Sequence, residues 1–225
     1  MPNIFAPFGF AESHRLGAAP NYQMAKRWIN PANAVPIYFG DPVVMVASSG
    51  YIAQASPQAA GAGSQIAGIF AGCEYISKSS KKPIWTPWWP GTPTDVNLSG
   101  TGFDVAAKVI DDPGVVFRVQ ANGMLTGTPA GQAPLTLIGN NATFTFGLAA
   151  TTPPGTSPAP NQFSGISNVA LDVTVATPAG TAFPFRIIDF IRDPPGVNGT
   201  DPTSAYFWLY VTFNNQDYKT TAGHG

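Results

Sequence analysis

Short stretches in which hydrophobic and polar residues alternate predict β-strands along most of the chain. Val169, Leu171, Val173 and Val175 are one such series, with Asp172 among the polar residues between them. Such a period of two is typical of a strand with one buried face. No stretch has a sustained helical period. The pattern predicts an all-β fold, a β-barrel or β-sandwich of about nine or ten strands.

Two segments carry a stronger pattern. Residues 206–213 are apolar on both faces, which predicts a central strand or an interface strand. Its two predicted faces are Phe207, Leu209, Val211 and Phe213 on one side, and Tyr206, Trp208 and Tyr210 on the other. Residues 103–110 and 115–123 flank the turn sequence Asp111–Gly114, so a β-hairpin is expected there.

The first 32 residues are interrupted by prolines and glycines but remain rich in aromatic side chains. Disordered tails lack such residues, so we expect an extended arm that lies on its own domain or on a partner. A short helix is expected at Gln23–Ile29. Residues 33–215 form the β domain, either as one unit or as two β lobes that meet near 124–165. Residues 216–225 form a polar tail.

Smaller elements are expected within residues 124–165. Two strands are predicted, at Leu135–Ile138 and at Ala142–Leu148. The segment 151–162 is rich in proline and threonine and predicts a surface loop.

Composition narrows the class of protein. Only 10% of residues are charged, against about 25% in an average globular protein. Such a surface suits a protein that packs against copies of itself or against partners. The net charge of −1 argues against binding to nucleic acid. No signal peptide or membrane-spanning run is visible, so synthesis in a cytoplasm without membrane insertion is expected.

Candidate catalytic chemistry is sparse. The single cysteine, Cys73, lies in an apolar stretch and is expected to be buried, and the two histidines are His14 and His224. No catalytic triad, metal site or cofactor site is therefore expected, and the chain is predicted not to be an enzyme. The remaining enzymatic alternative is a carboxylate pair such as Asp104 with Asp189, although an ion pair of Asp189 with a neighbouring arginine is favoured.

Aromatic residues supply the candidate contacts with a partner. The segment Trp85–Trp89 could be a loop anchored by packing against proline, a surface that stacks on sugars, or a buried subunit contact. The first of these is favoured from the residues alone. The predicted partner-binding residues are Phe5, Phe8, Phe10, Tyr22, Trp28, Trp85, Trp88 and Trp89.

A series of residues between positions 35 and 125 resembles head structural proteins of tailed bacteriophages. The matching residues are Gly68, Phe70, Gly72, Cys73, Tyr75, Pro83, Trp89, Pro90, Asp111, Asp112, Pro113, Val116, Phe117, Gln120 and Gly123. Gly40–Val43 and the last strand, with Trp208, Val211, Asn214 and Asn215, are also similar. The N-terminal arm and residues 124–165 have no counterpart.

The resemblance implies a capsid decoration, or cement, protein on the outer surface of the virion. Its partners would be the phage major capsid protein and copies of itself, as a trimer in the first place or as a dimer. The alternative is a carbohydrate-binding fibre or tail structural module. Neither reading involves nucleic acid or a membrane.

Overall fold

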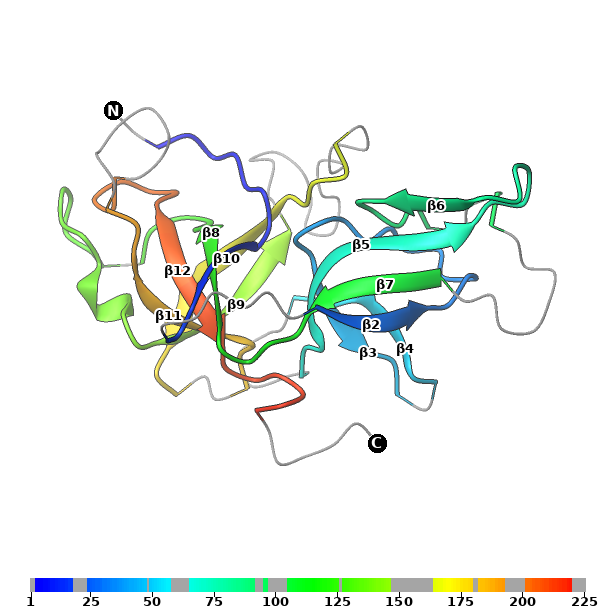
Figure 1. Ribbon diagram of the computed structural model, residues 1–225. Helices are drawn as coiled ribbons and strands as arrows, with labels where there is room; N and C mark the ends of the chain where they lie inside the picture. Colours follow the sequence, from blue (N-terminus) through cyan, green and yellow to red (C-terminus); the bar gives the residue numbers. More distant parts are fainter. Residues whose placement is uncertain are drawn as a thin grey trace.

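The computed structural model confirms an all-β fold, built as two six-stranded sheets that lie side by side (Figure 1). It describes residues 3–17, 24–47, 49–57, 65–91, 95–96, 105–125, 127–146, 164–179, 182–192 and 201–219. The strands are β1 (Ala11–Arg15), β2 (Met24–Ile29), β3 (Pro42–Met45), β4 (Tyr51–Gln54), β5 (Gly68–Ile76), β6 (Pro83–Thr86), β7 (Val105–Ile110), β8 (Val115–Gln120), β9 (Asn141–Phe146), β10 (Val169–Thr177), β11 (Phe185–Phe190) and β12 (Trp208–Phe213). In these parts of the chain the one helical element is a 3-10 turn, η1 (Leu135–Leu137).

The first sheet, which we call lobe 1, has the strand order β3-β4-β2-β7-β5-β6. Since β3 also pairs with β5, five strands close into a small barrel and β6 remains attached to the edge of β5. Side chains such as Phe70, Cys73 and Trp89 fill this barrel and are fully buried. Closure removes the free edges that an open sheet would expose.

The second sheet, lobe 2, has the order β1-β8-β12-β11-β9-β10. A bridge between Ala121 and Leu171 brings β10 against the end of β8, so this sheet also curves round on itself. Its core is rich in phenylalanine, and the predicted inner face of β12 (Phe207, Leu209, Val211, Phe213) is fully buried in it. The prediction that this is a central strand is confirmed, because β12 lies between β8 and β11.

The expected hairpin at Asp111–Gly114 is wrong. β7 pairs with β2 and β5 in lobe 1, whereas β8 pairs with β1 and β12 in lobe 2. The turn itself forms, and the Gly114 N–H donates to the Asp112 carboxylate at 2.9 Å, but its two strands separate into different sheets. The lobes therefore meet at this turn and not near 124–165.

Two buried aspartates hold this crossing between the lobes. Asp112 forms an ion pair with Arg15 of β1 at 3.0 Å, and Asp111 forms one with Arg27 of β2 at 3.1 Å. Both carboxylates are almost fully buried, so removing either arginine would leave a buried charge without its partner. The turn is thus tied to one strand of each lobe.

The N-terminal residues are extended over 3–10, where they run across lobe 2, and then enter the two sheets as β1 and β2. The segment expected to be a helix is strand β2, which lies between β4 and β7. Tertiary pairing explains the difference, because β2 alternates between exposed and more buried residues along its length. Strands β1 and β2 therefore belong to the β domain and are not part of a separable arm.

Within 124–165, only part of the expected structure is described. The strand predicted at Ala142–Leu148 is confirmed as β9, which begins one residue earlier and is described as far as Phe146, while Leu135–Leu137 is a 3-10 turn and not a strand. The predicted loop at 151–162 and the end of the predicted tail lie outside the described residues. In β10, Val169, Leu171 and Val173 are buried as expected, but Val175 is exposed.

Candidate functional site

The outward face of lobe 1 is divided between two environments. Where it approaches lobe 2, its side chains, including Ile69, Ala71 and Ile110, are buried in the core of that lobe. Farther along the same strands the face is open to solvent. We call this part the open face, and define it by Met24, Lys26, Trp28, Glu74, Trp85, Ala106 and Lys108.

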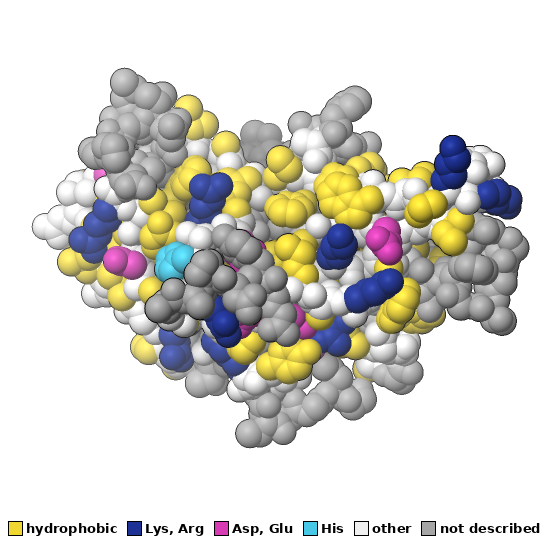
Figure 2. Space-filling model, in the orientation of Figure 1, with side chains coloured by type: hydrophobic (Ala, Val, Ile, Leu, Met, Phe, Trp, Pro, Cys, Tyr) yellow, Lys and Arg dark blue, Asp and Glu magenta, His cyan; other side chains and the backbone are white. Residues whose placement is uncertain are grey.

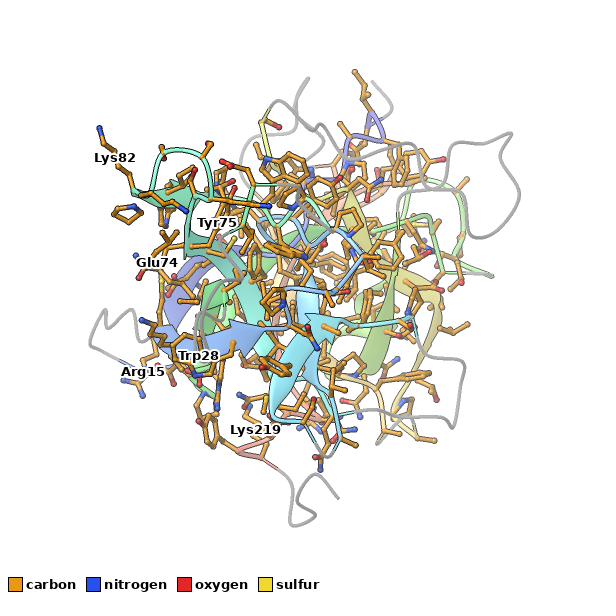
Figure 3. All side chains as sticks on the ribbon, turned by 90° about the vertical axis from the view of Figure 1, so that its right-hand side faces the viewer. Arg15, Trp28, Glu74, Tyr75, Lys82 and Lys219 are labelled. Atoms are coloured by element: carbon orange, nitrogen blue, oxygen red, sulfur yellow. The ribbon has the colours of Figure 1, made fainter. Side chains whose placement is uncertain are left out.

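Strand register places these residues on one side of the sheet. Trp28 is paired with Ala106, Ala106 with Glu74, and Glu74 with Trp85, so the four residues form a row across β2, β7, β5 and β6. Directly paired residues of antiparallel strands project to the same side. Figure 3 shows Trp28 and Glu74 along the side of the molecule that faces the viewer in Figure 1.

Two tryptophans stand at the ends of this row. Trp85 is 56% exposed and Trp28 is 41% exposed, which are high values for the largest apolar side chain. A β-bulge in β5 seats the Trp85 ring: at Gly72, φ is +117° and a Cβ atom would lie 3.2 Å from the indole. Glycine at this position therefore allows the ring to lie directly over the backbone of β5.

A shallow hollow of about 350 Å³ lies on this face. It is lined by Met24, Ala25, Lys26, Glu74, Ala106, Ala107 and Lys108. The small side chain of Ala106 forms the floor of the hollow, and longer side chains surround it. Figure 2 shows lysine and acidic side chains among hydrophobic ones over β2, β5 and β7. The volume is at the lower end of the range for small-molecule sites.

Three charged side chains, those of Lys26, Glu74 and Lys108, belong to the open face. The Lys26 ammonium lies 3.8 Å from a Glu74 carboxylate oxygen and 5.0 Å from the centre of the Trp28 ring. Lys108 is exposed and sits directly opposite Lys26 on the neighbouring strand. The face therefore combines aromatic surface with a small excess of positive charge.

Beneath the open face lies the only cysteine of the chain. Cys73 is fully buried, as predicted, and its burial raises the pKa of the thiol to about 12. A thiol with such a pKa is protonated at neutral pH and is a poor nucleophile. Cys73 therefore packs the core of lobe 1.

The structure separates the predicted partner-binding residues into three groups. Phe10 and Trp89 are fully buried in the cores of lobe 2 and lobe 1, so these two predictions are wrong for this fold. Trp89 also donates its indole N–H to the Asn33 carbonyl at 3.1 Å, as expected of an anchored loop. Trp28 and Trp85 are the two that reach solvent on one face.

The other aromatic residues pack against the chain itself. Phe5 contacts Tyr206 and Phe8 contacts Trp208, with ring centres 4.9 and 5.0 Å apart, so they cover the outer face of β12. Trp88 stacks in parallel on Tyr38 at 5.4 Å. Tyr22 lies outside the described residues.

Several residues of the open face were not predicted from the sequence, namely Met24, Lys26, Glu74, Ala106 and Lys108. The signal was present in the segment Met24–Ile29, which alternates between long exposed residues and inward ones. It was obscured by the expectation of a helix in that segment.

The carboxylates offer little for catalysis in the described part of the chain. Asp189 is exposed and pairs with Arg192 at 3.4 Å, as favoured from the sequence, and Asp104 lies outside the described residues.

No group of three or more metal-binding side chains is found among the described residues. Within the same residues, none of the helical structure has the length and hydrophobicity needed to cross a membrane.

Comparisons of the chain with protein-family models, with curated proteins and with solved structures find no match.

Proposed function

We propose that this chain is a bacteriophage capsid decoration protein, which binds the outside of the head and stabilises contacts between capsomers of the major capsid protein. The observation that carries the proposal is the open face of lobe 1. It presents Trp28, Trp85 and Met24 on the outer wall of the barrel, and it continues a surface of which another part is already buried against lobe 2. Trp and Met are enriched at protein interfaces.

The composition supports a protein whose surface is buried against partners when it functions. Charged residues make up 10% of the chain, and large apolar side chains are exposed on both lobes. Contiguous apolar patches on a soluble protein commonly mark interaction sites. The resemblance to phage head proteins supplies the identity of the partner. In this proposal the protein is a non-enzymatic component of the virion exterior and also contacts copies of itself.

The test is co-sedimentation with purified heads that lack this protein. The wild type should bind the heads and raise the temperature at which they release DNA. The double variant Trp28→Ala/Trp85→Ala should bind at least about tenfold more weakly, since exposed aromatic residues at interfaces often contribute more than 1 kcal/mol each. Leu135→Ala is the matched control, because Leu135 is 59% exposed on lobe 2.

Two results would contradict the proposal. The first is failure of the wild type to bind the heads of the phage that encodes it. The second is binding of the double tryptophan variant as tight as that of Leu135→Ala. Circular dichroism should show that all three proteins keep the same β structure.

A second candidate, the carbohydrate-binding module, is favoured by one specific observation: Trp85 is exposed and is the strand partner of Glu74, which lines the hollow. Aromatic rings exposed on a flat surface can stack on sugar rings. In this case the wild type would bind members of a neutral glycan array, Trp85→Ala would abolish that binding, and heads would not be bound.

A further inference from the structure

A pair of like charges on the open face is not explained by the fold. Lys26 and Lys108 are direct partners in the antiparallel pair of β2 and β7. Like charges in that position destabilise a sheet. Among the described residues that line the hollow, Glu74 is the one acid, and at 3.8 Å from Lys26 it offsets one of the two charges. The hollow thus keeps an excess of one positive charge.

The surroundings add charge of the same sign. Lys78, Lys81 and Lys82 are exposed in the turn between β5 and β6, at the end of the same sheet. Asp95 opposes them: it accepts hydrogen bonds from Ser77 and Ser79, which lower its pKa and keep it ionised. Figure 3 shows Lys82 on the same side of the molecule as Glu74 and Trp28.

We infer that the open face binds an acidic, extended segment of the capsid protein, with carboxylates between Lys26 and Lys108 and apolar side chains against Trp28 and Trp85. This inference rests on the proposed function and names the chemistry of the partner. Charge complementarity selects the occupant, because an anionic group between the two opposed lysines would relieve their repulsion.

The dimensions of the face suit such a segment. Trp28 and Trp85 are separated by three strand spacings, which is about 14 Å. An extended chain advances about 3.3 Å per residue, so about four or five residues reach from one ring to the other. A segment of that length can place one or two carboxylates over the hollow.

The experiment compares binding to purified heads at about 20 mM and about 300 mM salt, since screening weakens exposed charge pairs. At low salt, Lys108→Gln should bind several-fold more weakly than wild type, and Lys26→Gln/Lys108→Gln roughly tenfold more weakly. At high salt these differences should disappear. Glu74→Gln should bind more tightly than wild type, because it removes the negative charge that lies beside Lys26.

The matched control is Arg192→Gln, which removes a cation from lobe 2 whose ion pair with Asp189 is exposed. Its affinity for heads should equal that of the wild type at both salt concentrations. Urea unfolding separates binding from folding: Lys108→Gln should be at least as stable as the wild type, since it removes the repulsion and keeps the ion pair of Lys26 with Glu74. A merely structural role for these lysines predicts the opposite change.

The outcomes are distinguishable. If wild type binds heads but the lysine variants bind equally well at low salt, the acidic-segment inference is overturned while decoration stands. If wild type does not bind heads at all, the proposed decoration function is refuted, and this inference falls with it.

Discussion

Phe10→Ala tests whether the N-terminal segment is part of the core or a free contact element. Phe10 is 1% exposed; its ring stacks on Phe185 with centres 4.0 Å apart and meets the edge of Phe117 at 6.2 Å. Truncating a buried phenylalanine typically costs about 3–5 kcal/mol. Because a domain is usually stable by only about 5–15 kcal/mol, this variant should lose a large part of its free energy of unfolding.

Urea unfolding followed by tryptophan fluorescence and by circular dichroism measures this loss. Phe5→Ala is the matched control, because Phe5 is half-buried and contacts Tyr206 at the surface of lobe 2; about 1 kcal/mol is expected. If Phe10→Ala changed the free energy of unfolding by no more than Phe5→Ala, then Phe10 would not be a core residue, and the account of the N-terminal segment would be wrong.

Two further predictions concern buried groups. Cys73 should not react with Ellman's reagent at pH 8 in the native protein and should react fully in urea, because its thiol pKa is raised to about 12 by burial; rapid native labelling would contradict this. Burial likewise raises the pKa of Asp41 above 3.8, although hydrogen bonds from Ser167, Tyr38 and Gln54 oppose the shift. A raised folded-state pKa means that the contribution of Asp41 to stability is greatest below about pH 3.8 and declines as pH rises through the folded-state pKa. Relative to Asp41→Asn, the wild type should therefore lose stability over that range, and parallel pH profiles of the two proteins would refute the assignment.

The sequence was sufficient to predict the fold class and much of the core. Alternation along β10 and β12 identified their buried faces, because a period of two survives whatever sheet a strand joins. The burial of Cys73 was also predicted correctly. These are local properties, decided by how apolar a residue and its neighbours are.

The partners of the strands could not be predicted in the same way. Asp111–Gly114 has the composition of a hairpin turn, yet β7 and β8 pair with strands distant in the sequence. The residues of a turn determine the conformation of the turn, but they do not determine which strands β7 and β8 pair with. The open face was missed for a related reason: Lys26 and Lys108 are 82 positions apart in the sequence, and only the register of β2 with β7 places them opposite one another.

The path of the chain through the two lobes has a consequence for folding during synthesis. All strands of lobe 1 lie between Met24 and Ile110, whereas lobe 2 joins β1 to strands that begin at Val115. A ribosome therefore releases every strand of lobe 1 before any partner of β1 exists. The strands of lobe 1 can therefore pair while the rest of the chain is still being made. β1 can pair only after β8 has emerged, and Phe10 can stack only after Phe185 has emerged. The segment that contains β1 and Phe10 is therefore made before lobe 1 but reaches its final contacts after it, and during that interval its apolar side chains are accessible to chaperones and to neighbouring nascent chains.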